Sequence, residues 1–150
     1  MSQSLAKIYL HLVFSTKNRQ PILHDEVRNS LHRYLPSVLG NLGCHVVSIN
    51  SVEDHVYILF ELARTVEVSK VVEDAKKSSS KWLKTQSGVP EDFAWQSGYG
   101  VFSVSASNVP AVQDYVRSQG EHHRRHSFQD ELRARMVKHG IEYEERYVWE

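Results

Sequence analysis

This chain of 150 residues lacks several features that mark specialised classes of protein. Its one cysteine, Cys44, cannot form an internal disulfide, which excludes a disulfide-stapled scaffold. No apolar run approaches the roughly 20 residues of a membrane-spanning helix. The N-terminus shows no basic segment followed by an apolar stretch, so we expect no signal peptide. These absences predict a cytoplasmic protein in which Cys44 is a buried, unreactive thiol.

The chain also has no net charge, because its 18 basic residues balance its 18 acidic residues. This balance argues weakly against a protein wrapped in nucleic acid. Four of the acidic residues, however, crowd into the last nine positions: Glu142, Glu144, Glu145 and Glu150. We therefore predict one mildly basic domain over residues 1–140 and an acidic, aromatic tail over residues 141–150. Nine histidines could add positive charge just below neutral pH.

Several catalytic and binding motifs are absent as well. The chain has no glycine-rich phosphate loop, no CxxC pair and no HExxH sequence. The first predicted strand lacks the aromatic pair of an RNA-recognition motif. Common nucleotide-hydrolase, zinc-peptidase and RNA-recognition functions are therefore not indicated.

The hydrophobic pattern predicts an alternation of strands and helices. Periods of two and of 3.6 residues, with turn residues between them, divide the chain into four strands and four helices. The strands are predicted at Ala6–Ser15, His45–Val52, His55–Leu62 and Tyr99–Ser105. The helices are predicted at Asp25–Leu39 with Pro36 inside, Val66–Lys84, Asn108–His123 and Ser127–Lys138. The order βαββαβ followed by helices predicts an α+β, ferredoxin-like antiparallel sheet with helices on one face plus C-terminal helices.

The strand that begins at His55 carries the first candidate site. Side chains alternate along a strand, so His55 and Tyr57 point to one face and Val56 points to the other. An imidazole here could bind a divalent metal, whereas a protonated phenol is a poor ligand because its ordinary pKa is near ~10. Alternatively, His55 caps the hairpin and Tyr57 lines an ordinary surface.

The helix after Asn108 carries the second candidate site. Tyr115 and Gln119 are four residues apart and therefore share a helix face. A tyrosine hydroxyl can attack a phosphodiester when a metal polarises the phosphate, and the Gln119 carbonyl suits a hard cation. Alternatively, Tyr115 is a half-buried core tyrosine and Gln119 faces solvent.

Basic residues on two predicted helices, and directly after the second of them, are candidates for binding nucleic-acid phosphates. They are spaced so that several share a face opposite the apolar stripe, although such a face is often simply solvated. The candidates are Lys70, Lys77, Lys81, Lys84, Arg117, Arg124 and Arg125.

Taken together, these segments resemble the HUH-type single-tyrosine transposases of bacterial insertion sequences, including the IS200-like and REP-associated tyrosine transposases. The resemblance covers nearly the whole chain. It is carried by residues 11–19 (HLVFSTKNR), 54–59 (DHVYIL), 76–82 (KKSSSKW), 95–100 (WQSGYG) and 115–123 (YVRSQGEHH).

The resemblance implies an enzyme that cuts single-stranded DNA at hairpin-flanked ends and forms a 5′-phosphotyrosine, using Mg²⁺ or Mn²⁺. The nucleophile falls on Tyr115, and the metal ligands fall on His55, Tyr57 and Gln119. A homodimer with an active site shared between subunits, in a bacterial cytoplasm, is expected. Tyr57 stands where the family has a second histidine.

Three consequences of Tyr57 remain open. Water could replace the missing ligand, another histidine such as His11 or His123 could substitute, or the protein could bind DNA without cutting it. A further alternative is a ferredoxin-like protein whose sheet serves only dimerisation or ligand sensing.

Overall fold

The computed structural model describes residues 2–119, 127–145 and 148–149, and its strands form a four-stranded sheet. The strands lie in the order β2-β3-β1-β4, and every neighbouring pair is antiparallel. In chain order the elements are β1 (Tyr9–Ser15), η1 (Lys17–Arg19), α1 (Asp25–Asn41), β2 (His45–Ser51), β3 (His55–Glu61), α2 (Val68–Leu83), β4 (Gly100–Val104), η2 (Ala106–Asn108), α3 (Val109–Arg117) and α5 (Phe128–Lys138). The predicted ferredoxin-like α+β fold is confirmed.

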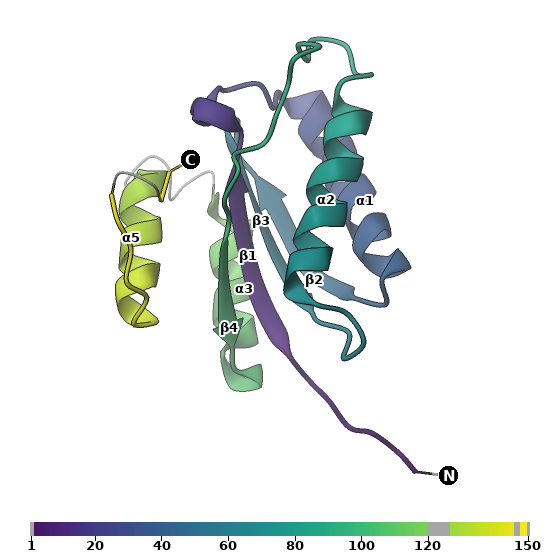
Figure 1. Cartoon of the computed structure of the whole chain (residues 1–150), viewed down its shortest axis with the longest axis vertical. Helices are drawn as coiled ribbons and strands as arrows, with labels where there is room; N and C mark the ends of the chain where they lie inside the picture. Colours follow the sequence, from purple (N-terminus) through teal and green to yellow (C-terminus); the bar gives the residue numbers. More distant parts are fainter. Residues whose placement is uncertain (1, 120–126, 146–147, 150) are drawn as a thin grey trace.

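Different helices cover the two faces of the sheet (Figure 1). On one face, side chains such as Leu12, Ile58 and Phe60 pack against α1 and α2. On the other face, Val13 and Leu59 pack against α3 and α5. The helices within the βαββαβ unit thus share one face, and the C-terminal helices cover the other.

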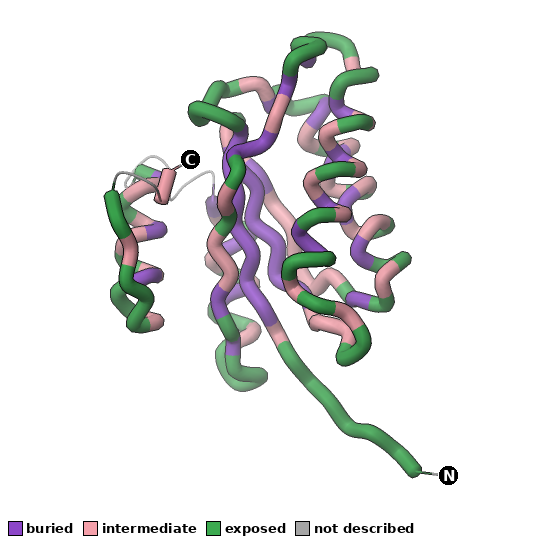
Figure 2. Tube along the Cα trace, viewed as in Figure 1, coloured by how far each residue is buried: buried purple, intermediate pink, exposed green. Residues whose placement is uncertain are grey.

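The two central strands are buried on both sides (Figure 2). Six of the seven residues of β1 and six of the seven residues of β3 are buried. This explains why both strands read as nearly continuous apolar runs rather than as alternating ones. Within the described part of the chain, no helix is long and apolar enough to cross a membrane.

The first strand is shorter than its sequence suggests. The apolar pattern predicted a strand from Ala6, whereas β1 begins at Tyr9. Tyr9 pairs with Glu61, the last residue of β3, so residues before Tyr9 have no strand residue opposite them. Strand length is set here by the partner and not by the local pattern.

Helix α1 continues through Pro36 and ends at Asn41, two residues beyond the predicted end. Proline removes one backbone donor and strains the preceding turn. Leu35 and Leu39, on either side of it, are fully buried in the core. Their burial holds the last turns in place despite the missing hydrogen bond.

Helix α3 ends earlier than the pattern indicated, at Arg117 instead of His123, and residues 120–126 lie outside the described part. The Asn50 side chain of β2 donates to the carbonyls of Val116 and Arg117, at 2.9 and 3.1 Å. The Ser118 hydroxyl donates to the Asp114 carbonyl at 2.7 Å. Side chains thus satisfy the last carbonyls of the helix, which allows the chain to turn there.

The two predicted N-caps differ in outcome. Ser127 accepts a hydrogen bond from the Asp130 backbone N–H at 3.1 Å, as a capping residue should. Asn108 stands at the N-cap of α3 but makes no side-chain capping bond. Its backbone is already helical, because the short helix η2 leads directly into α3.

Candidate active site

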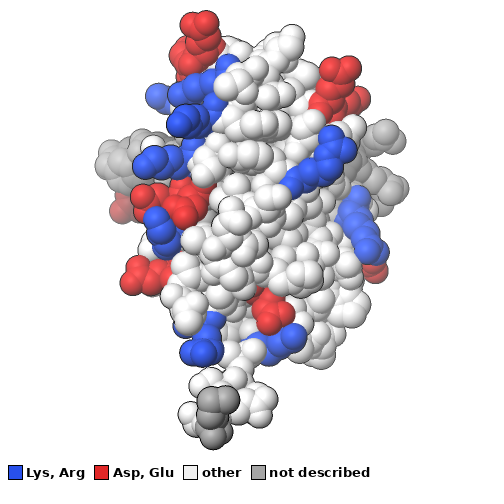
Figure 3. All heavy atoms as spheres, turned by 90° about the vertical axis from the view of Figure 1, so that its right-hand side faces the viewer, with Lys and Arg blue, Asp and Glu red and all other residues white. Residues whose placement is uncertain are grey.

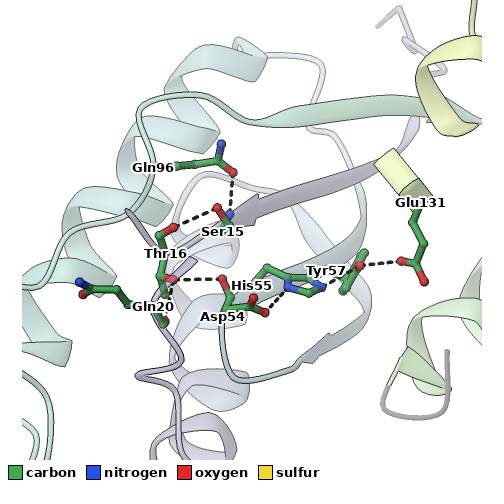
Figure 4. Close-up of polar contacts among 8 residues, drawn as sticks. All are labelled: Ser15, Thr16, Gln20, Asp54, His55, Tyr57, Gln96 and Glu131. Carbon is green, nitrogen blue, oxygen red and sulfur yellow. Dashed lines mark hydrogen bonds and ion pairs between the residues drawn. The ribbon is translucent and has the colours of Figure 1, made fainter. Parts of the chain in front are cut away.

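His55 begins strand β3, and its ring is held from both sides. The backbone is paired with Ser15 of β1, and the carbonyl of Asp54 accepts from the Thr16 N–H at 2.8 Å. The His55 Nδ1 lies 2.6 Å from the Asp54 carboxylate, and Nε2 lies 2.9 Å from the Tyr57 hydroxyl (Figure 4). An ionised carboxylate only accepts hydrogen bonds, so Asp54 orients the ring with a proton on Nδ1.

Glu131 of α5 connects the two tyrosines. Its Oε2 accepts a hydrogen bond from the Tyr57 hydroxyl at 2.9 Å and another from the Tyr115 hydroxyl at 2.8 Å. Elements β3, α3 and α5 therefore meet at one carboxylate oxygen. Hydrogen bonds to an ionised acceptor are stronger than neutral ones, so Glu131 fixes the direction of the Tyr115 hydroxyl.

Both tyrosines are held in the protonated form. Burial, followed by the negative charge of Glu131, raises the pKa of Tyr57 far above its ordinary value. The same two causes raise the pKa of Tyr115 to about 12, and contacts with Gln119 and Arg135 offset only part of the rise. Tyr115 is thus a neutral phenol near pH 7, and attack by its oxygen needs a group that accepts the proton.

His11 of β1 packs against both tyrosine rings. It stacks on Tyr57 with ring centroids 5.8 Å apart and meets the edge of Tyr115 at 5.9 Å. Burial and the nearby charges of Arg135 and His139 lower the pKa of His11 to about 3. Neither ring nitrogen has a hydrogen-bond partner among the described residues. A neutral imidazole is also the form that binds metals, so His11 stays a candidate substitute ligand.

A small cavity lies among these groups. Its volume is about 10 Å³, close to the minimum for one water molecule. The polar side chains lining it are His11, Tyr57, Tyr115, Glu131 and Arg135. A cavity of this size cannot hold a nucleotide. A ligand of that size would enter only if the side chains lining the cavity moved outward.

The predicted metal ligands suit a divalent cation at two of three positions. Gln119 is fully buried, its Nε2 donates to the Tyr115 carbonyl at 3.0 Å, and its Oε1 has no partner among the described residues. Such an oxygen suits Mg²⁺ or Mn²⁺. His55 offers an imidazole nitrogen, although a metal at Nε2 must displace the Tyr57 hydroxyl. Tyr57 itself does not fit, because a protonated phenol is a poor ligand.

Two alternative interpretations from the sequence are wrong. Tyr57 is 2% exposed, so it does not line an ordinary surface, and Gln119 does not face solvent. Tyr115 is half-buried, as the plainer interpretation expected. Tyr115 and Gln119 lie close together, but Gln119 follows the C-cap Ser118 and does not belong to α3.

The predicted DNA-binding residues lie on both sides of the sheet. Arg117 is exposed at the end of α3, on the same side as Tyr115. The four lysines are exposed on the opposite side, three on α2 and the last at its C-cap: Lys70, Lys77, Lys81 and Lys84. Basic and acidic side chains are interspersed on the side formed by α1 and α2 (Figure 3). Arg124 and Arg125 lie outside the described residues.

No sequence pattern pointed to Glu131. It is a glutamate in the first turn of α5, where acidic residues are common because they complement the helix dipole. Asp54 begins the segment DHVYIL that carries the family resemblance, but its contact with the His55 ring was not predicted. Only the packing of α5 against the sheet shows that Glu131 faces Tyr57 and Tyr115.

The fold and these residues define a ferredoxin-like domain with a strand histidine and a helical tyrosine on the same face. Residues 4–119 match the family described as Transposase IS200 like. The match spans well over half of the chain, and the chain therefore belongs to the IS200-like transposase family.

Curated relatives agree with this assignment. The ISDra2 transposase TnpA of Deinococcus radiodurans is 23% identical over 114 residues, which cover 73% of this chain and 81% of that protein. The transposase for insertion sequence element IS200 of Salmonella typhimurium is 27% identical over 117 residues, which cover 74% of this chain and 76% of that protein.

Two solved structures share the fold. A Deinococcus radiodurans R1 protein, assigned as a transposase and solved at 1.90 Å, has a TM-score of 0.59 and 24% identity, covering 79% of this chain and 98% of that one. A REP-associated tyrosine transposase bound to a REP hairpin has a TM-score of 0.60 and 13% identity, covering 82% and 74%. At these identities the likeness establishes the fold.

Proposed function

We propose that this chain binds hairpin-flanked single-stranded DNA and cleaves and rejoins it through a covalent 5′-phosphotyrosine at Tyr115. One observation carries the proposal: the Tyr115 hydroxyl lies 2.8 Å from Glu131, on the sheet face that also holds His55. Membership of the IS200-like family supports DNA as the substrate. The REP hairpin bound to a protein of the same fold supports a hairpin beside the cut.

In the cleavage step, the Tyr115 oxygen attacks the scissile phosphorus and forms a P–O bond. The bond from phosphorus to the 3′-oxygen breaks, and that oxygen takes a proton from water to become a 3′-hydroxyl. Glu131 is placed to accept the phenolic proton, since its Oε2 already accepts the Tyr115 hydrogen bond. Rejoining reverses these transfers.

A divalent cation, Mg²⁺ or Mn²⁺, would be held by His55 and Gln119 and would polarise the scissile phosphate when bound. Asp54 orients His55 for this role through the contact at Nδ1. Tyr57 weakens the site, because it provides a protonated phenol where a second imidazole would stand. We expect lower metal affinity than a complete histidine pair would give.

Phosphates of the bound DNA would be neutralised by the exposed lysines of α2 and by Arg117, with Arg124 and Arg125 as further candidates. The footprint then spans both sides of the sheet. A bacterial cytoplasmic location belongs to the same proposal, because the substrate DNA lies there.

The test is a search for a covalent adduct. The protein is incubated with labelled single-stranded DNA carrying hairpin ends, with and without Mn²⁺, and run on a denaturing gel. Tyr115→Phe and Tyr57→His are run beside it. An adduct that vanishes in Tyr115→Phe supports the proposal. If no variant cuts DNA that the protein demonstrably binds, the assignment of Tyr115 as nucleophile is wrong.

Tyr57 favours a second candidate function, DNA binding without cleavage. Its hydroxyl is hydrogen-bonded to the His55 Nε2, the atom that a metal would need, and it donates to Glu131 of α5. In this case the parent forms no adduct, and Tyr57→His restores one. Binding to hairpin DNA would then be the same in the parent and in Tyr115→Phe.

We also propose that the protein forms a homodimer, with an active site shared between subunits as an expectation from the family. Within one chain, however, Tyr115 already lies beside Tyr57, with ring centroids 6.0 Å apart. A shared site would require the α3 region to leave this position. Mixing Tyr115→Phe with His55→Ala distinguishes the two arrangements, because only a shared site regains adduct formation in the mixture.

A further inference from the structure

A second cavity lies at the His55 end of the sheet, outside the network around Glu131. Its volume is about 240 Å³, and its lining residues are Lys17, Asn18, Gln96, Ser97 and Trp149. We propose that this cavity is a subsite for one unpaired DNA base beside the phosphate that Tyr115 attacks, with the base stacked on Trp149. The subsite rests on the proposed function and adds to it how the single strand is held.

Two segments far apart in sequence build one wall of this cavity. The Lys17 N–H donates to the Ala94 carbonyl at 2.9 Å, and the Gln96 N–H donates to the Ser15 carbonyl at 2.9 Å. The Gln96 Oε1 accepts from the Ser15 N–H at 2.7 Å (Figure 4). The half-buried ammonium of Lys76 donates to the Gln96 carbonyl at 2.8 Å. This wall is therefore fixed before any ligand binds.

The turn that presents Asn18 to the cavity has an unusual backbone. Asn18 and Arg19 both adopt positive φ, 58° and 52°, and neither is glycine. Asparagine tolerates this region better than most residues, whereas for arginine it is unfavourable. Such conformations are unfavourable and occur preferentially at ligand-binding positions. The Thr16 hydroxyl, which donates to the Gln20 carbonyl at 2.8 Å, closes the turn.

Trp149 forms the opposite wall and is held by α5. Its indole N–H donates to the Glu145 carboxylate at 3.1 Å. The same carboxylate accepts two hydrogen bonds from Arg133, at 2.7 and 3.0 Å. The Arg133 guanidinium lies 5.1 Å from the centre of the indole ring. The ring is thus oriented by several contacts and remains partly exposed.

The lining matches the chemistry of an unpaired nucleotide. An ammonium suits a phosphate, the side-chain amides suit the hydrogen-bonding edge of a base, and an indole suits its face. Sites for drug-sized ligands usually enclose roughly 300–1,000 Å³, so a smaller cavity favours a single base over a longer segment. A small apolar ligand would not explain the four polar or charged residues of the lining: Lys17, Asn18, Gln96 and Ser97.

The cavity adjoins the tyrosine site. The centroid of the Phe128 ring lies 4.4 Å from that of the His55 ring and 6.4 Å from that of the Trp149 ring, so Phe128 lies between His55 and Trp149. Lys17 follows Ser15 by two residues, and Ser15 is the strand partner of His55. A base in the cavity would therefore lie on the side of Phe128 that faces away from His55, and its phosphate could extend toward the proposed active site.

The test measures binding separately from cleavage. The full chain carrying Tyr115→Phe is titrated with fluorescein-labelled hairpin DNA that has an unpaired extension, and anisotropy is followed at fixed salt. Adding Trp149→Ala should weaken binding roughly 5- to 150-fold, the range for losing one base–aromatic stack. Trp149→Phe should retain most of the affinity. Trp82→Phe, on the α1–α2 side where Trp82 stacks on Tyr34, serves as the matched control and should change nothing.

A scan with one abasic sugar at each position of the extension locates the base. At one position the abasic sugar should lower the affinity as much as Trp149→Ala does. Combining that abasic sugar with Trp149→Ala should lower the affinity no further than either change alone. Equal or tighter binding by Trp149→Ala, additive losses, or no binding of these oligonucleotides by the parent would overturn the subsite. An intact subsite in a protein that forms no adduct would instead overturn the proposed cleavage.

Discussion

The two faces of the sheet use the same strands for different purposes. The face toward α1 and α2 is an apolar core built from leucine, valine, isoleucine and phenylalanine side chains. The face toward α3 and α5 places His11, Tyr57 and Glu131 within the packed layer, next to Tyr115. Alternate residues of β1 and β3 therefore build an apolar core on one side and line the proposed active site on the other.

The difference shows how a small domain can accommodate reactive groups. Burying polar atoms costs free energy unless they are hydrogen-bonded, and several atoms on the α3–α5 face have no partner among the described residues. The apolar face offsets that cost, since each fully buried large side chain contributes about 1.5–3 kcal/mol. Each prediction below tests whether one face can be altered without affecting the other.

Glu131→Gln should have the largest effect. The amide keeps the shape of the side chain but accepts a proton far less readily, so adduct formation by Tyr115 should fall roughly 10²- to 10⁴-fold. Time courses of adduct formation at saturating DNA measure the change. Lys138→Ala, on the exposed side of the same helix, is the control and should react like the parent. Unchanged rates in Glu131→Gln would remove Glu131 from the reaction.

Phe60→Ala should have the largest effect on stability. Phe60 is fully buried on the α1–α2 face, and losing such a ring typically costs about 3–5 kcal/mol. The midpoint of urea unfolding measures the loss. At a temperature where the variant is folded, its adduct rate at saturating DNA should match the parent. A large rate change in the folded variant would show that the two faces are coupled.

His11→Phe should remove acid sensitivity. Folding lowers the pKa of His11 from 6.5 to about 3, so between these values the unfolded chain binds more protons. The free energy of unfolding is therefore unaffected by protonation of His11 above pH 6.5. As the pH falls below 6.5, it decreases by up to about 1.4 kcal/mol per pH unit. Between pH 7 and pH 5, the free energy of unfolding measured with urea should fall by up to roughly 2 kcal/mol more in the parent than in His11→Phe. Parallel losses would mean that other groups set the acid sensitivity.

Most of the fold could be predicted from the sequence, because periodicity and turn residues are local properties. The start of β1 at Tyr9 could not, since it depends on where β3 ends. The end of α3 at Arg117 could not either, because Asn50, which lies far away in sequence, caps it. In both cases a tertiary partner decided a boundary that the local pattern left open.

The candidate site was predicted only in part. His55 and Tyr115 stand out because each belongs to a recognisable pattern, and the structure places both on the same face of the sheet. Glu131 belongs to no pattern, and its role arises from packing between α5 and the sheet. The burial of Gln119 likewise depends on the turn at Ser118, where α3 ends and its helical periodicity stops.

Lys81→Ala should have the smallest effect, and it tests whether the α1–α2 face takes part in binding at all. Lys81 is exposed on α2, so if it contacts a duplex phosphate, its loss should lower the salt-dependence slope of binding by about 0.9 and the affinity a few-fold. Lys70→Ala is the matched control on the same helix, because Asp74 at 3.0 Å already offsets its charge, and its effect should be smaller. Anisotropy titrations over a range of salt concentrations measure both slopes. An unchanged slope in Lys81→Ala would place α2 outside the DNA footprint and restrict DNA contact to the face that carries Tyr115.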